Sequence, residues 1–126
     1  MKRTALRKRG TSEYSRAHAK AWTEFARYIR NRDPWCYTCR TRETTDAGHF
    51  LHNRLDFDEI NVHGQCARCN RYLHGNPDAY EMRLRADYGD RVIDSLRYRA
   101  NQVTRYTIDE LEEIAKHYRE LNKAFK

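Results

Sequence analysis

The chain has 126 residues, which suits one domain with helical additions, and no apolar run comes near the roughly 20 residues that a membrane-spanning helix needs. The basic N-terminus is not followed by the apolar segment of a secretory signal, so we expect a cytoplasmic protein with reduced cysteines and no membrane partner. Only 39% of the residues are hydrophobic and 34% are charged, so the core is expected to be small and to need an additional cross-link.

The net charge of +7 is concentrated at the start of the chain. Residues 1–42 contain twelve Lys or Arg against three acids, whereas residues 43–126 contain thirteen against fifteen. Residues 1–11 show no periodicity, which predicts a flexible basic arm. Such an arm can contact nucleic-acid phosphates or only keep the protein in solution, and charge alone favours neither. The candidate DNA contacts in the arm are Lys2, Arg3, Arg7, Lys8 and Arg9.

Residues 12–32 are predicted to form a basic amphipathic helix that reaches about Arg30. Apolar residues recur at helical spacing and are expected to face the core rather than to stack on bases. These residues are Tyr14, Ala17, Ala21, Trp22, Phe25 and Ile29. The candidate DNA contacts of the helix fall largely on its other faces: Arg16, Lys20 and Arg27.

A β-hairpin is predicted between the helix-breaking pair Asp33-Pro34 and the second half of the chain. We expect its strands at residues 47–51 and 57–62, joined by a polar loop. A short helix should follow, from about Cys66 to Gly75.

Helices are predicted for the rest of the chain. Asn76 is expected to cap a helix that starts with Pro77 and ends at Gly89, and a further helix should cover about residues 90–100.

Residues 101–126 are expected to supply a final helix, at about 108–124, which a Thr107–Glu110 capping box begins. Its apolar stripe could pack on the core or on a second copy of the chain, and the sequence does not decide between the two.

Four cysteines form two C-x2-C pairs, Cys36-Tyr-Thr-Cys39 and Cys66-Ala-Arg-Cys69. Together they complete the tetrahedral thiolate shell of structural Zn²⁺, whereas a redox pair would not need a second knuckle at this distance. The spacer between them is long enough to hold the predicted hairpin. Zn²⁺ would therefore clamp the hairpin to the helix that follows, and its binding would contribute on the order of 10 kcal/mol to folding.

Polar residues lie inside this clamp on each predicted element. His49 is on the first strand, Asn61 is on the second, and Asn70 and His74 are four residues apart on the short helix, where they would share a face. His63 alternates with Asn61 along the strand, and it is as well suited to structural hydrogen bonding as to contact with the site.

Three stretches combine these residues with the cysteines: Ala47-Gly-His-Phe50, Asn61-Val-His-Gly-Gln-Cys66 and Cys69-Asn-Arg-Tyr72, with Gly75-Asn76 after them. In this order and register the chain resembles the NinG (Rap) recombination proteins of lambda-type phages and, more broadly, the HNH or ββα-metal nucleases. The resemblance covers residues 33–100.

The resemblance implies an α+β fold, mostly α, in which a zinc-stapled, treble-clef-like HNH core at residues 33–100 is flanked by helices. It implies a structure-specific endonuclease that hydrolyses phosphodiester bonds in branched DNA, such as Holliday junctions and D-loops, with Mg²⁺ or Mn²⁺ as the catalytic ion. Such a protein would work in the bacterial host cell, where it could also meet other recombination proteins.

Site roles also follow from the resemblance. His49 would be the general base that activates water, and Asn61 would orient the imidazole or tie the hairpin together. Asn70 and His74 would bind the catalytic ion, which neutralises the departing 3′ oxygen and leaves a 5′-phosphate.

Gly48 departs from the family pattern, because many HNH enzymes place a metal-binding Asp or His there. Asp46 is on the same strand face and could replace that ligand. Alternatively, His49 binds the ion and His52 or an aspartate is the base. The candidate phosphate contacts beside the site are Arg68 and Arg71.

The main alternative function is a non-catalytic zinc module that binds DNA or a recombination protein. In that case His49 and Asn61 would only pin the hairpin. A homodimer is the expected assembly, because a four-way junction has near two-fold symmetry and two strands must be cut to resolve it.

Overall fold

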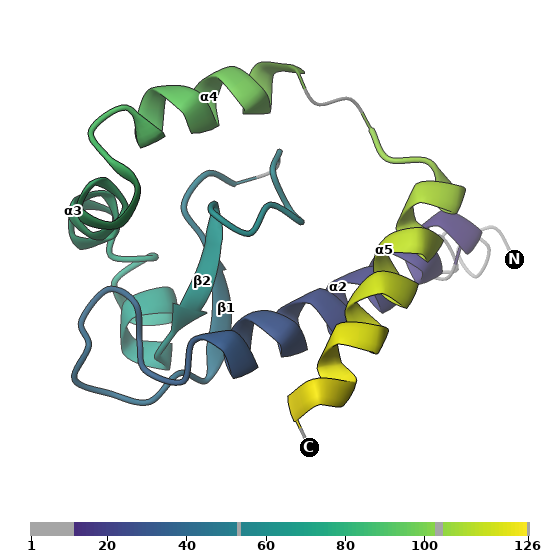
Figure 1. Cartoon of the computed structure of the whole chain (residues 1–126), viewed down its shortest axis with the longest axis horizontal. Helices are drawn as coiled ribbons and strands as arrows, with labels where there is room; N and C mark the ends of the chain where they lie inside the picture. Colours follow the sequence, from purple (N-terminus) through teal and green to yellow (C-terminus); the bar gives the residue numbers. More distant parts are fainter. Residues whose placement is uncertain (1–11, 53, 103–104, 126) are drawn as a thin grey trace, which may run out of the picture. The chain divides into compact units, whose positions relative to one another are not determined.

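The computed structural model describes residues 12–52, 54–102 and 105–125, and these residues form a mostly helical α+β structure with a small two-stranded sheet (Figure 1). The mostly helical α+β class that the sequence predicts is thus confirmed. The predicted arm at residues 1–11 lies outside the described residues. In chain order the elements are α2 (Glu13–Arg32), β1 (Asp46–His49), β2 (Val62–Gln65), the π-helix η2 (Arg68–Tyr72), α3 (Pro77–Tyr88), α4 (Val92–Gln102), α5 (Ile108–Asn122) and the 3-10 helix η3 (Lys123–Phe125).

The chain divides into two compact units. The helical unit combines Met1–Phe25 with Arg105–Lys126, and the hairpin unit comprises Ala26–Thr104. The boundary falls inside α2, whereas the sequence placed it at the end of that helix.

The helical unit is built from the first part of α2 and from α5 (Figure 1). Phe25 meets Tyr118 edge to face, with ring centroids 4.9 Å apart, and Asn122 Nδ2 donates to the Glu24 carbonyl oxygen at 3.0 Å. The central part of the apolar stripe of α5 is therefore buried within its own chain, whereas Leu121 and Phe125 at its end are exposed. The buried residues are Ala17, Ala21 and Phe25 on α2 and Leu111, Ala115 and Tyr118 on α5.

The predicted helix ends are largely confirmed. The Thr107 hydroxyl accepts from the Glu110 backbone N–H at 3.0 Å and the Glu110 carboxylate accepts from the Thr107 N–H at 2.8 Å, which completes the capping box of α5. Gly89 ends α3 with a φ of 99°. Asn76, however, makes no side-chain cap, because its φ is 50° and its amide nitrogen lies 3.5 Å from Cys69 Sγ.

The sheet of the hairpin unit is an antiparallel pair, but its second strand lies later than predicted. The register pairs Asp46 with Gln65, Ala47 with Gly64, Gly48 with His63 and His49 with Val62. The predicted strand at residues 57–62 is therefore wrong, since only Val62 belongs to β2.

Asp58 explains the shift of the second strand. Its carboxylate accepts from the backbone N–H groups of Ile60 and Asn61 at 2.9 and 3.0 Å, and its carbonyl accepts from Val62 N–H at 3.0 Å. An Asp side chain that bonds the following backbone in this way favours a turn over an extended strand.

The core of the hairpin unit lies among the hairpin, α3 and α4. Tyr80 is fully buried, and its hydroxyl donates to the Gly48 carbonyl oxygen at 2.6 Å, which attaches α3 to β1. The buried cluster consists of Tyr37, Leu55, Tyr80, Leu84, Val92, Ile93, Leu96 and Ala100.

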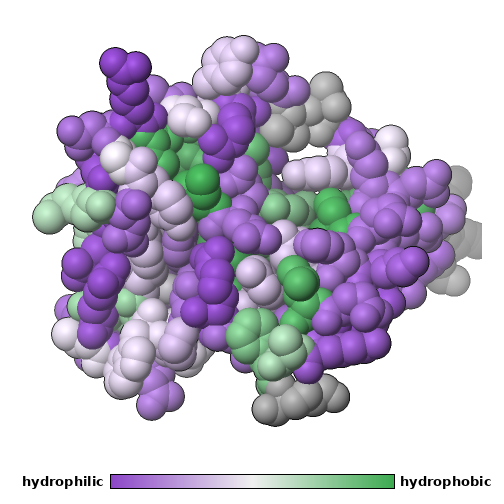
Figure 2. Space-filling view, in the orientation of Figure 1, coloured by the Kyte–Doolittle hydropathy of each residue, from purple (hydrophilic) through white to green (hydrophobic). Residues whose placement is uncertain are grey.

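The surface is strongly polar, as a mean hydropathy of −1.09 leads one to expect. Hydrophilic side chains cover most of the face shown in Figure 2, with small hydrophobic patches between them. Among the described residues, no helix has the length and apolar character that crossing a membrane would require.

Candidate metal and catalytic site

The two cysteine pairs converge in the hairpin unit, as predicted. The Sγ atoms of Cys36, Cys39, Cys66 and Cys69 all lie within 4.8 Å of one another, and none of the four is in a disulfide. Four thiolates at this separation fit a tetrahedral ion such as Zn²⁺. The structure therefore contains a cluster that could hold a metal.

Hydrogen-bond donors surround the sulfur atoms. Burial alone would raise the pKa of the Cys36 thiol, but hydrogen bonds from backbone groups and from the Thr38 hydroxyl outweigh it and lower the pKa to about 6. The Thr41 hydroxyl donates to Cys39 Sγ at 3.3 Å. These contacts favour thiolate at Cys36 and Cys39, which is the form that binds metal. At Cys66, burial prevails and raises the pKa to about 11.

The cysteine cluster holds η2 beside the hairpin, because Cys66 follows β2 directly and Cys69 lies within η2. The helix is shorter than predicted and ends at Tyr72. Three consecutive residues then take left-handed φ values: His74 at 53°, Gly75 at 91° and Asn76 at 50°.

His74 is therefore exposed beyond the end of the helix. The expectation that Asn70 and His74 share one helical face is wrong for this reason.

Asp46 and Asn70 are brought together, as the predicted metal site requires. Asn70 Nδ2 donates to Asp46 Oδ2 at 3.0 Å. Arg71 forms a two-pronged ion pair with the same carboxylate, with both N–O distances 2.9 Å. Burial would raise the pKa of Asp46, but the hydrogen bonds from Arg71 and Asn70 prevail and lower it, so the carboxylate is ionised at neutral pH.

Gly48 faces this group from the middle of β1. A Cβ atom at this position would overlap Gln65 Oε1 and would come within 2.8 Å of Asn70 Oδ1. Two side-chain oxygens thus converge on the glycine. Sequence reasoning missed Gln65, although it stands immediately before Cys66 and opposite Asp46 in the hairpin register.

His49, the predicted base, is the last residue of β1 and alternates with Gly48, so its side chain starts from the other strand face. Its Nε2 lies 3.4 Å from Asp56 Oδ1, and both side chains are partly exposed. The His52 ring is a further neighbour, with centroids 6.0 Å apart. Asp56 lies in the loop between the strands and belongs to no motif that would have marked it as a site residue.

Asn61 ties the hairpin loop together, which is one of the two roles expected for it from the sequence. Its Oδ1 accepts from Leu51 N–H at 2.8 Å, and its Nδ2 donates to the carbonyl oxygens of Leu51 and Leu55 at 2.9 and 3.0 Å. The side chain is fully buried. Asn61 therefore fixes the loop that carries Asp56.

His63 is a buried structural residue. Its ring stacks on Tyr37 with centroids 3.8 Å apart, and its Nε2 is 3.2 Å from the Tyr88 hydroxyl. Burial lowers the pKa of His63 to about 4, with a smaller contribution from Arg32. The imidazole is consequently neutral at physiological pH.

The predicted DNA contacts fall into two groups. The structure describes five of them, and all five are exposed: Arg16, Lys20, Arg27, Arg68 and Arg71. The five residues of the basic arm lie outside the described residues.

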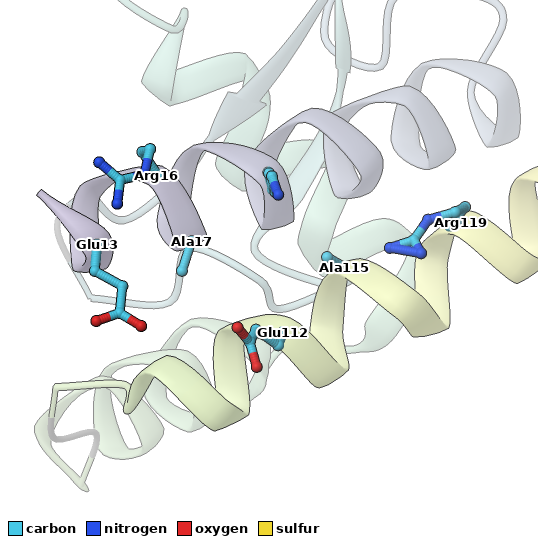
Figure 3. A pocket seen from close by; sticks show the side chains of 7 residues that line it. Glu13, Arg16, Ala17, Glu112, Ala115 and Arg119 are labelled. Atoms are coloured by element: carbon cyan, nitrogen blue, oxygen red, sulfur yellow. The ribbon is translucent and has the colours of Figure 1, made fainter. Parts of the chain in front are cut away.

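A surface pocket of the helical unit is lined by residues of both signs (Figure 3). Glu13 and Ala17 point from α2 toward α5, which contributes Glu112 and Arg119. Because Arg16 and Lys20 share this pocket with two acids, its local charge is mixed rather than uniformly basic.

Comparison with known proteins gives one consistent result. The family model described as "Bacteriophage Lambda NinG protein" matches residues 1–126. The chain is 33% identical over 97 residues to Protein ninG of Escherichia phage lambda, a match that covers 72% of this chain and 47% of the relative. Protein ninG of Salmonella phage P22 is 32% identical over 97 residues, with the same coverage.

Protein ninG of Enterobacteria phage H19B is 34% identical over 91 residues, covering 68% of this chain and 45% of the relative. The chain spans about half the length of the curated relatives it matches. No solved structure matches it.

Proposed function

The chain belongs to the NinG family of bacteriophage proteins, and from this premise we propose that it is a metal-dependent, HNH-type endonuclease that cuts branched DNA such as Holliday junctions and D-loops. The observation that carries the proposal is the arrangement around β1. His49 and Asp56 lie at its end, and Asp46 and Asn70 meet beside it, next to a thiolate cluster.

His49 is the proposed general base. An imidazole can accept a proton from water at neutral pH. Asp56, 3.4 Å from Nε2, would hold the ring and stabilise the imidazolium after proton transfer. Asn61 supports this pair by fixing the intervening loop.

Asp46 and Asn70 are the proposed ligands of the catalytic Mg²⁺ or Mn²⁺, since carboxylate and amide oxygens suit such hard cations. When bound, the ion would supply charge neutralisation for the scissile phosphate and the departing oxygen. Arg68 and Arg71 are exposed on η2, and Arg71 pairs with Asp46; both would contact the phosphate backbone. His74 is left out of the set because it lies beyond the end of η2.

A non-catalytic zinc module remains the second candidate function. The observation that favours it is that Arg71 and Asn70 both pair with Asp46, so groups of the protein satisfy its carboxylate. In such a module the same contacts would only fasten η2 to β1.

Cleavage assays separate the two functions. The substrates are a supercoiled plasmid and a four-way junction with Mg²⁺ or Mn²⁺. We expect His49→Ala to lower the cleavage rate about 100-fold or more, because a positioned general base contributes on this order. His117→Ala, a histidine exposed on α5, is the matched control and should cleave as the wild type does.

Both proteins should retain zinc and the wild-type circular dichroism spectrum. An inactive wild type, or a His49→Ala variant that is fully active, would support the binding module instead.

A further inference from the structure

We propose that Gln65 is a third oxygen ligand of the divalent-cation site formed by Asp46 and Asn70. The inference rests on the proposed function only for the role of the bound ion. The site itself follows from two side-chain oxygens beside Gly48 and from the Asp46 carboxylate that Asn70 contacts.

Gln65 is fully buried, yet its Oε1 is a buried acceptor without a hydrogen-bond partner in the described part of the chain. A buried amide oxygen left without a partner costs roughly 1–3 kcal/mol. A buried oxygen of this kind needs a partner for its lone pair. A cation bound to Gln65 Oε1 would be such a partner.

The orientation of the Gln65 amide is fixed by its nitrogen. Nε2 donates to the Gly75 carbonyl oxygen at 2.9 Å and to the Thr38 hydroxyl at 3.2 Å. Exchanging the two amide atoms would set Oε1 against the Gly75 carbonyl oxygen, with two acceptors facing each other. Oε1 must therefore point toward Gly48.

Asn70 Oδ1 approaches the same place from η2. A Cβ on Gly48 would overlap Gln65 Oε1 and lie 2.8 Å from Asn70 Oδ1, so both oxygens lie against the same side of Gly48. Asn70 Nδ2 donates to Asp46 Oδ2 at 3.0 Å, so the carboxylate lies against the same amide. The carboxylate adds the negative charge that two neutral amides lack.

This donor set is chemically selective. Three oxygens, of which one is charged, suit Mg²⁺ or Mn²⁺, whereas Zn²⁺ prefers the nearby thiolates. Arg71 is the competitor for the site because it forms an ion pair with the same Asp46 carboxylate. Its side chain is 66% exposed, so it can leave the carboxylate without loss of core packing.

The test is Mn²⁺ binding to the full-length, zinc-loaded chain, measured by electron paramagnetic resonance without DNA. We expect one Mn²⁺ per chain outside the cysteine cluster. Gln65→Met keeps the side-chain length but removes the oxygen and should weaken binding at least tenfold, as should Asn70→Leu. Gln102→Met changes an exposed glutamine at the end of α4 and should bind as the wild type does.

A second measurement on the wild type needs no substitution. In nuclear magnetic resonance spectra, Mn²⁺ should broaden the side-chain amide signals of Gln65 and Asn70 before that of Gln102. This keeps the proposal open to refutation if Gln65→Met fails to fold.

The possible results separate this site from the nuclease activity. If Mn²⁺ binding needs Asn70 but not Gln65, the third ligand is refuted while cleavage of DNA can still stand. If binding needs Gln65 but no DNA is cleaved, the cation site stands and the nuclease proposal fails. If the wild type binds no Mn²⁺ at millimolar concentration, the site is refuted.

Discussion

His63 shows how a single buried side chain makes stability depend on pH. It stacks on Tyr37 and has a pKa of about 4, whereas an unfolded histidine titrates near 6.5. Between these values the unfolded chain binds a proton that the folded chain does not, so stability falls as the pH falls. Above pH 6.5 the group has no effect.

We therefore expect the free energy of unfolding to fall by up to about 3 kcal/mol between pH 6.5 and pH 4 because of His63. Urea unfolding at several pH values measures this. His63→Phe keeps a ring against Tyr37 but cannot titrate, so its pH dependence should be smaller by that amount. Equal slopes for the two proteins would contradict the prediction.

Single residues also mark the limit of sequence reasoning. Asp46 and Asn70 were predicted as neighbours from the alternation of a strand and the family pattern, and they do meet. His74 was misplaced because no pattern announces three successive left-handed residues, of which two are not glycine. Gln65 and Asp56 carry no motif, and only the hairpin register and the loop place them beside the site.

Elements were predictable in proportion to the regularity of their patterns. The long amphipathic helices and the capping box of α5 were correct because periodicity and capping act within a few residues. The second strand was misplaced because Phe57, Ile60 and Val62 suggest a strand at residues 57–62, whereas Asp58 folds this segment into a turn. The irregular η2 depends on the cysteine cluster, which is a long-range constraint.

The cysteine cluster should be required for the hairpin unit to fold. Its two strands have four residues each, and such short pairs are marginal alone. We expect Cys36→Ser with Cys66→Ser to abolish cooperative thermal unfolding of this unit, followed by circular dichroism and zinc content. Removing the metal from the wild type with a chelator should have the same effect. A zinc-free variant with wild-type helicity and a cooperative transition would contradict this.

For the whole molecule, two-fold assembly is the remaining prediction. The central part of the apolar stripe of α5 is buried within the chain, whereas Leu121 and Phe125 at its end are exposed, so only that end of the stripe is accessible to a second copy. Because two strands of a junction must be cut, we expect two chains per four-way junction. Light scattering during gel filtration measures this mass, and a strict monomer with and without a junction would contradict the expectation.

The ion pair between Arg71 and Asp46 would couple the binding of a divalent cation to the binding of a phosphodiester. The Arg71 guanidinium acts as the counterion of the Asp46 carboxylate. A divalent cation that replaces it would release a positive group toward an incoming phosphodiester, and a phosphodiester that attracts the guanidinium would vacate the carboxylate for the cation. The two binding equilibria would then be thermodynamically linked, and each ligand would tighten the other by the same factor.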